Sequence, residues 1–237
     1  MSTILSYNAD KFKILISDTR TTKFTTESKI FDNSTLKIHY INNYGFCTGI
    51  GIGELVRNTF NEILTYHSID NTVLQKAFRI AHKSIQDECD EKVLDFLNQS
   101  AVIVSNINAI NLFSKCLLQH VNSDSVSIKK NQLNIQFPFD ITNGEKERIH
   151  LLTQTIPEPT IENVLLLMLN TFKEISDISE DVSHICSIAI LGQEIESPFF
   201  IQNNVNEIIN ILKENSFHIL KNEFEHYKTQ LISWENT

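Results

Sequence analysis

Positive charge is scarce in this chain of 237 residues, where 20 Lys and Arg face 29 Asp and Glu and leave a formal net charge of -9. Proteins neutralise nucleic-acid phosphates with clusters of Lys and Arg, and no basic stripe occurs here. The composition therefore argues against nucleic acid as a partner.

Cysteine is equally sparse, and the four cysteines show no C-x-x-C spacing. Neither a zinc site nor a disulfide framework is indicated, so we expect buried free thiols at Cys47, Cys89, Cys116 and Cys186. The eight histidines form no H-x-x-x-H or H-E-x-x-H pair, and no Gly-Lys-Ser/Thr follows Gly49. We therefore expect no metal, no P-loop and no cofactor.

Long apolar runs are missing as well. The N-terminus lacks the basic leader and apolar run of a signal peptide, and no later stretch reaches the roughly 18 apolar residues of a membrane helix. The sequence thus predicts a cytoplasmic protein without a membrane partner.

The chain begins with patterns typical of strands. Thr3–Tyr7 and Phe12–Ser17 predict a hairpin, and after a Thr-rich loop at Thr19–Ser28, Leu36–Ile41 and Tyr44–Thr48 predict a second one. These strands would supply two antiparallel pairs.

Helical spacing then replaces alternation. Apolar residues at three-to-four spacing predict a helix from Glu54 and another over Val73–Leu97. Strand patterns return at Ala101–Ser105, Ala109–Leu118 and Leu133–Phe137.

The remainder, apart from an irregular stretch before Pro159, predicts a helix capped by Thr160, a buried strand at Ile185–Leu191 and a long terminal helix from Val205. This order predicts an α/β fold of two antiparallel sheets flanked by helices. We place the main domain at residues 1–200 and a C-terminal helical extension at 201–237.

The first strand pair carries a specific pattern. Ser2 opens an S-T-I-L-S run, and Asp18 follows sixteen positions later in a D-x-R with Arg20. This resembles proteasome β-subunits and the related bacterial heat-shock protease, which are N-terminal-nucleophile (Ntn) hydrolases. Their mature chains begin with Thr-Thr and carry an Asp at the same distance; here Ser2 replaces the first Thr and Thr3 keeps the second.

The resemblance continues through the second hairpin. Lys37 begins a strand, polar turn and return strand, and Gly49, Gly51 and Gly53 lead into the helix at Glu54. The family has a similar lysine-bearing strand and small-residue loop there. The resemblance implies a four-layer αββα sandwich.

The chemistry implied by the resemblance needs no histidine base. An α-amine with a pKa of about 7.7–8.0 can accept the proton of the hydroxyl on its own residue, once the preceding Met1 is removed. The resemblance assigns the nucleophile to Ser2 and the donor for the oxyanion to the N–H of Gly49 or Gly51. It assigns to Lys37 the charge that favours the deprotonated amine and hydroxyl, and to Asp18 the anchoring of that lysine.

Several positions depart from the family pattern. Asp18 and Lys37 are three residues further apart than usual, which leaves Lys29 as an alternative lysine. The region Ile149–Pro159 has no glycine, so the family's supporting Ser there has no counterpart. A later family Asp with a Ser three positions on is matched only by Glu180 and Ser183.

Supporting roles thereby fall to Arg20, Glu180, Asp181 and Ser183. Each site residue also has a structural interpretation: Asp18 and Arg20 can close a strand, and the glycines can serve a turn or close helix packing. A catalytically inactive scaffold or assembly subunit that keeps Met1 is therefore the alternative function, and an amidase or ligase is a further one.

The family acts on peptides or proteins and forms rings, so the resemblance implies such substrates and a homo-oligomer, as a ring or a dimer. The sequence identifies neither the ring size nor any ATPase partner.

Overall fold

A computed structural model describes residues 2–24, 29–115, 125–153, 159–192 and 199–214. These residues belong to two compact units. The first unit comprises residues 1–36 and 130–237, and the second comprises residues 37–129. No helix among the described residues is long and apolar enough to cross a membrane.

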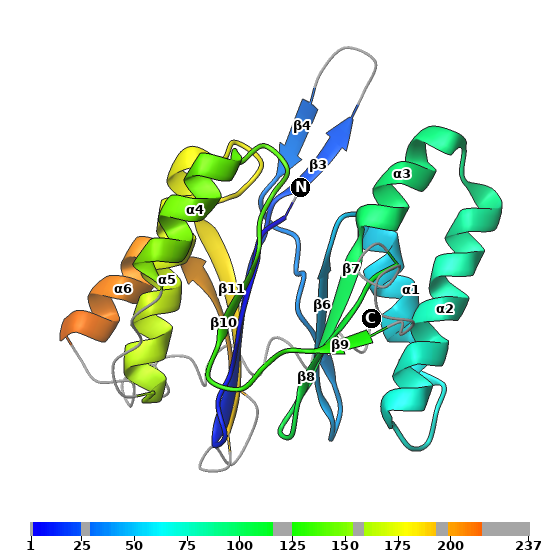
Figure 1. The fold of residues 1–237 in the computed structure, drawn as a ribbon, viewed down its shortest axis with the longest axis horizontal. Coiled ribbons are helices and arrows are strands. Elements are labelled where there is room, and N and C mark those ends of the chain that lie inside the picture. Colours follow the sequence, from blue (N-terminus) through cyan, green and yellow to red (C-terminus); the bar gives the residue numbers. More distant parts are fainter. Residues whose placement is uncertain (1, 25–28, 116–124, 154–158, 193–198, 215–237) are drawn as a thin grey trace. The chain divides into compact units, whose positions relative to one another are not determined.

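The first unit contains a five-stranded antiparallel sheet in the order β10-β1-β2-β11-β12 (Figure 1). Its strands are β1 (Ile4–Asn8), β2 (Phe12–Asp18), β10 (Leu133–Gln136), β11 (Ile185–Gly192) and β12 (Phe199–Asn204). Its helices are α4 (Asn143–Leu152), α5 (Ile161–Ile178) and α6 (Val205–Glu214). The long strand β2 is central, with β1 on one side and β11 on the other.

The core of this unit lies between the sheet and α5. Alternate residues of β1 and β2, among them Leu5 and Ile14, join Leu165 and Phe172 of α5 in one buried cluster. Burying each such side chain contributes about 1.5–3 kcal/mol. The opposite face of the sheet is buried too, since Leu15 is only 1% exposed. Burial on both faces explains why β11 is an almost continuous apolar run.

The second unit contains another five-stranded antiparallel sheet, in the order β5-β6-β7-β8-β9. Its strands are β5 (His39–Ile41), β6 (Gly45–Ile50), β7 (Ala101–Asn106), β8 (Ile110–Phe113) and β9 (Ser125–Ser127). Its helices are α1 (Gly53–Leu64), α2 (Asn71–Glu88) and α3 (Glu91–Gln99). Apolar residues of α1 and α2 pack with Val102 and Val104 of β7, which covers one face of this sheet.

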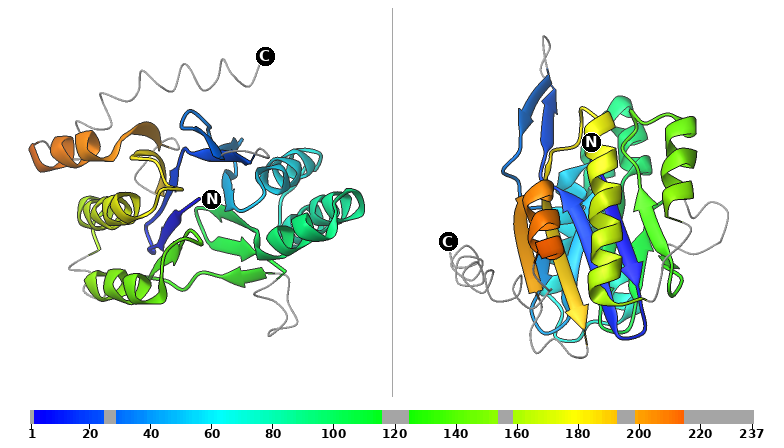
Figure 2. Two further views of the ribbon diagram at one scale, coloured as in Figure 1. Left: turned by 90° about the horizontal axis from the view of Figure 1, so that it is seen from above. Right: turned by 90° about the vertical axis from the view of Figure 1, so that its left-hand side faces the viewer.

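A separate two-stranded hairpin follows β2. It consists of β3 (Thr21–Phe24) and β4 (Lys29–Asp32), and it belongs to the first unit. Figure 2 shows these strands extending past the end of the first unit's five-stranded sheet. The prediction of a loop over Thr19–Ser28 was wrong for residues 21–24, because a Thr-rich segment without apolar alternation still pairs with β4.

Two further predictions need correction. The single helix expected over Val73–Leu97 is divided into α2 and α3, because Asp90 leaves the helical conformation and its carboxylate accepts the Val93 N–H at 3.0 Å. Helix α4 was missed because only Ile149 of its residues is buried, which leaves no apolar period. Its capping box between Thr142 and Glu145 was the available signal.

Most other elements lie where the sequence predicted them, although the short strand β9 and strand β12 were not expected. Strand β12 spans the proposed domain boundary at residue 200, and α6 packs in the core of the first unit. The rest of the expected terminal helix, beyond residue 214, lies outside the described residues.

The cysteines that the structure describes are free thiols. Cys47 and Cys186 are buried as predicted, whereas Cys89 is half-buried. Burial raises the pKa of the Cys47 thiol to about 12 and raises that of Cys186 further. Both thiols are therefore unreactive in the folded protein. Cys116 lies outside the described residues.

Stability should depend on pH through His82 of α2. This residue is 2% exposed, and neither ring nitrogen has a hydrogen-bond partner among the described residues. Burial, with a smaller effect of Lys115, lowers its pKa below 6.5. The unfolded chain therefore binds the proton first, and the free energy of unfolding should fall as the pH drops below about 6.5.

The variant His82→Leu should flatten this decline. Urea unfolding at pH values from about 8 to about 5 measures it, and the difference between variant and wild type should widen towards acid. A residual slope is expected from His39, whose pKa burial also lowers. Parallel pH curves for the two proteins would contradict this assignment.

Candidate functional site

The candidate nucleophile lies at the start of the first strand pair. Ser2 lies two residues before the start of β1 and is 8% exposed, and Thr3, between them, is completely buried. The Thr3 Oγ1 donates to the carbonyl oxygen of Gln136 at 2.9 Å, so the start of β1 is held on its β10 side. On the other side, the register pairs Ile4 with Ser17, which brings Asp18 opposite Thr3.

The Asp18 carboxylate is held by two backbone N–H groups. Thr3 N–H donates to Oδ1 at 3.1 Å, and Arg20 N–H donates to Oδ2 at 3.0 Å. The Asp18 side chain is 0% exposed, and hydrogen bonds to a carboxylate stabilise its charged form. Ser2 and Asp18 were predicted as parts of one site. Thr3, the residue after Ser2, is hydrogen-bonded to Asp18, so the two residues are linked through Thr3.

The loop between α5 and β11 meets the same end of β2. Ser183 Oγ accepts the Thr19 N–H at 3.3 Å and donates to the carbonyl oxygen of Ile185 at 2.7 Å. The hydroxyls of Thr19 and Ser183 lie 3.0 Å apart. The β2–β11 ladder ends at the pair of Asp18 and Cys186, so these bonds continue the pairing by one residue.

The other predicted supporting residues also lie in this region. Arg20 Nη1 donates to the backbone carbonyl of Glu180. Asp181 is buried, and its N–H donates to Ser179 Oγ at 3.3 Å. Ser179 in turn donates to the carboxylate of Asp140 at 2.8 Å, which ties this loop to the segment before α4.

Sequence reasoning missed Thr19, Ser179 and Asp140. The position of Thr19 next to Asp18 was the only signal in the sequence for its role. Ser179 and Asp140 are 39 positions apart, so no local pattern joins them.

The hairpin register argues against Lys29 as the site lysine. Lys29 pairs with Phe24, at the opposite end of the hairpin from the pair of Thr21 and Asp32. Phe24 lies six positions after Asp18, which is about 20 Å of extended chain. Lys37 is half-buried and is the first residue of the second unit. Lys37 therefore remains the site lysine predicted from the sequence.

The two candidate glycines have packing reasons of their own. A Cβ on Gly49 would lie 2.4 Å from the carbonyl oxygen of Ala101 and 2.5 Å from Cγ2 of Val56, so only glycine lets α1 approach β6 and β7 this closely. Gly51 has φ +86°, a conformation that favours glycine, and a Cβ there would meet Ser100 Oγ. Ser100 Oγ accepts the next N–H, that of Ile52, at 2.9 Å.

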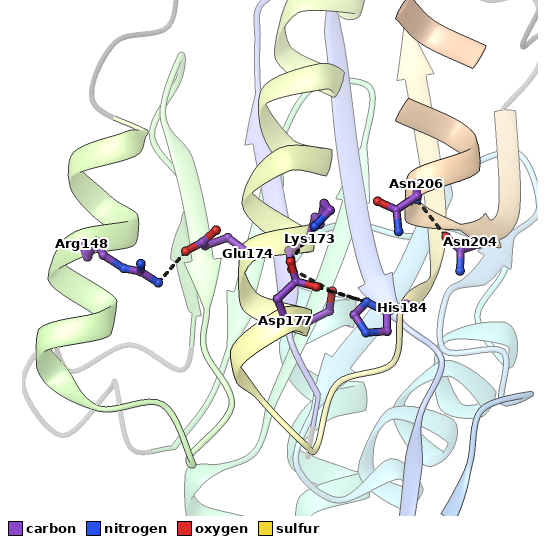
Figure 3. A network of polar contacts seen from close by, with 8 residues as sticks. Arg148, Lys173, Glu174, Asp177, His184, Asn204 and Asn206 are labelled. Carbon is purple, nitrogen blue, oxygen red and sulfur yellow. Dashed lines mark hydrogen bonds and ion pairs between the residues drawn. The ribbon is translucent and has the colours of Figure 1, made fainter. Parts of the chain in front are cut away.

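A second polar network in the first unit has the residue types of a catalytic triad (Figure 3). Ser176 Oγ lies 3.0 Å from His184 Nδ1, and Asp177 Oδ1 lies 3.7 Å from the same nitrogen. A triad needs Ser and Asp on opposite ring nitrogens. Lys173 also pairs with Asp177 at 2.6 Å. This network therefore joins α5 to the start of β11 and is not a nucleophilic site.

Among the described residues, no group of three or more His, Cys, Asp or Glu side chains is arranged to hold a metal ion.

No protein-family model and no curated protein sequence matches the chain. Solved structures do match. Eukaryotic HslV from Trypanosoma brucei is 15% identical with a TM-score of 0.51, over 81% of this chain and 99% of that one. Anbu from Hyphomicrobium sp. strain MC1 is 10% identical with a TM-score of 0.62, over 94% of this chain and 97% of that one. A Gly-1 mutant of the same Anbu gives 9% identity and a TM-score of 0.64, over 95% and 97% of the two chains.

These similarities show the fold and nothing finer. The chain has the α/β fold of HslV and Anbu, in which the described residues form two antiparallel five-stranded sheets with six flanking helices. The predicted Ntn-hydrolase type of fold is therefore confirmed, and the fold is proteasome-like. At 9–15% identity the similarities carry no activity over to this chain.

The glycine geometry makes a prediction about stability. Gly49→Ala should lower the free energy of unfolding by about 1–3 kcal/mol, because backbone or Val56 must move to admit the methyl group. Gly53→Ala is the matched control, since a Cβ there meets nothing within 4 Å and alanine favours the helix it begins by up to about 1 kcal/mol. Urea unfolding compares the two, and equal stabilities would contradict the close packing at Gly49.

Proposed function

We propose that the chain is an Ntn-type hydrolase that cleaves amide bonds through Ser2 after Met1 has been removed. The observation that carries the proposal is the position of Ser2, which directly precedes the residue whose N–H is bonded to Asp18, in a fold similar to that of HslV. Peptides or proteins as substrates, a homo-oligomer and a cytoplasmic location come with the proposal from the family resemblance.

The reaction follows from a hydroxyl and an amine on one residue. The α-amine accepts the proton while Ser2 Oγ attacks the substrate carbonyl carbon, and the C–N bond of the tetrahedral intermediate then breaks. The leaving amine takes the proton, and water hydrolyses the acyl ester to regenerate Ser2. About a tenth of α-amines are neutral at pH 7, which is enough for a general base.

The Asp18 carboxylate contributes negative charge and a fixed reference point. It anchors the N–H of Thr3, so the residue before it has a defined direction. The proposal assigns Lys37 to lowering the pKa of the amine and hydroxyl, and the N–H of Gly49 or Gly51 to the oxyanion. Both assignments come from the sequence resemblance alone.

The supporting residues act through the backbone in this proposal. Ser183 holds Thr19 to β11, and Arg20 contacts the carbonyl of Glu180. Asp181 lies in the same loop and is buried. Their part is to keep the end of β2 in one conformation while Ser2 reacts.

A catalytically inactive scaffold or assembly subunit is the second candidate function. This candidate is favoured because Asp18, Gly49 and Gly51 each have a structural role that needs no catalysis. Asp18 accepts backbone hydrogen bonds, and the two glycines allow close packing. The two candidates differ in the N-terminus, because retained Met1 converts the amine of Ser2 into an amide and removes the base.

Covalent labelling tests the nucleophile. After intact mass has established whether Met1 is removed, an epoxyketone or lactone probe should label wild type once, and Ser2→Ala should reduce labelling to background. Ser6→Ala is the matched control on the same strand, because its buried hydroxyl has no hydrogen-bond partner among the described residues. Full retention of Met1, or equal labelling of wild type and Ser2→Ala, would contradict the hydrolase proposal.

Labelling also decides between the two lysines. Lys37→Ala should lower the labelling rate by at least about tenfold, because the proposal gives its charge the task of lowering the pKa of the amine. Lys29→Ala should label like wild type, since its hairpin position is far from Asp18 along the chain. If Lys29→Ala lowers the labelling rate and Lys37→Ala does not, Lys29 is the site lysine instead.

A further inference from the structure

We propose that Arg20 is a positioning residue which couples the β3–β4 hairpin to the Asp18 carboxylate, so that the state of the hairpin changes the geometry at Ser2. The consequence for catalysis rests on the proposed hydrolase function, whereas the coupling itself does not.

The Arg20 side chain joins three segments of the first unit. Its Nε donates to Oδ1 of Asn33, just after β4, at 2.7 Å. Its Nη1 donates to the carbonyl of Glu180 in the α5–β11 loop. Its Cζ lies 4.8 Å from the centre of the Phe31 ring on β4. A planar guanidinium can donate in two directions and stack on a ring at once, which a lysine cannot.

The backbone of Arg20 contacts the site directly. Its N–H donates to Oδ2 of Asp18, whose Oδ1 accepts the N–H of Thr3. A continuous series of contacts therefore runs from Asn33 and Phe31 through Arg20 and Asp18 to the residue after Ser2. A rotation of the Arg20 peptide unit would move a backbone N–H that donates to the carboxylate.

The hairpin is the element best suited to change in this series. It forms a two-stranded sheet by itself, and such ribbons are marginally stable in water without further contacts. Its apolar residues Ile30 and Phe31 are 51% and 41% exposed. Contacts at its base anchor it, including the Thr35 N–H bond to the Thr19 carbonyl at 3.2 Å and the pair of Thr21 and Thr35 hydroxyls at 3.0 Å.

Amide hydrogen exchange followed by mass spectrometry tests the coupling without needing activity. Arg20→Lys keeps the charge and removes the planar fork, and it should raise exchange in the hairpin, in the α5–β11 loop and in the N-terminal peptide together. Arg57→Lys is the control, because Arg57 forms a solvent-exposed ion pair with Glu54 at 3.3 Å in the second unit. It should leave all three regions unchanged.

Asn33→Ala is the decisive variant. It damages the hairpin end of the series and leaves Arg20, Asp18 and Thr3 in place, so it also keeps the test valid if Arg20 variants do not fold. Raised exchange in both the hairpin and the N-terminal peptide supports the coupling. Raised exchange in the hairpin alone, or in no region, overturns it and leaves Arg20 as a local anchor.

A chemical probe of Ser2 separates this outcome from failure of the hydrolase proposal. Periodate oxidises an N-terminal serine only when its amine is free, and the rate should rise in Asn33→Ala if the geometry at Ser2 loosens. Covalent probe labelling should fall by about tenfold or more in the same variant. If the unfolded wild type resists periodate, its Ser2 amine is not free, and the hydrolase proposal fails. The hydrogen-exchange experiment still decides whether Arg20 couples the hairpin to Asp18.

Discussion

The structure around the candidate site depends on how one carboxylate is held. Asp18 accepts one N–H from the chain that enters β1 and one from the chain that leaves β2. A buried carboxylate without such donors would be costly, and an N–H left without an acceptor at the start of β1 would cost about 1–3 kcal/mol. Residues 2 and 3 are therefore fixed to the end of the central strand.

The position of β2 explains why so many segments meet at its end. Its neighbours β1 and β11 both have their site-facing ends beside Asp18, because antiparallel pairing places residues 3 and 186 opposite it. The α5–β11 loop is added through Ser183, and the β3–β4 hairpin follows directly along the chain. Several non-local contacts thus share one short stretch, residues 18–20.

Some of this could be predicted from the sequence because it is local. The sixteen-residue spacing of Ser2 and Asp18 follows from a hairpin in which Ile4 pairs with Ser17, and alternation of apolar residues sets that register. Helix α5 was equally clear because its apolar residues follow the helical period, and strand β11 because it is an almost continuous apolar run. Helix α4 was missed because only Ile149 of its residues is buried, and strand β4 was missed because its residues 30–32 are exposed, so burial left no pattern there. The bonds of Ser183 to Thr19 and of Ser179 to Asp140 join distant positions, which one sequence does not reveal.

The same geometry limits what mutations at the site can prove. Asp18, Gly49 and Gly51 each satisfy a backbone or packing requirement, so their replacement would impair an enzyme and an inactive scaffold alike. Arguments from these residues therefore bear on the fold before they bear on catalysis. Ser2 is different, because its hydroxyl and amine carry the proposed reaction while Thr3 carries the hydrogen bonds that hold the strand. Because the proposed reaction and these hydrogen bonds belong to different residues, a substitution at Ser2 can distinguish an enzyme from an inactive scaffold.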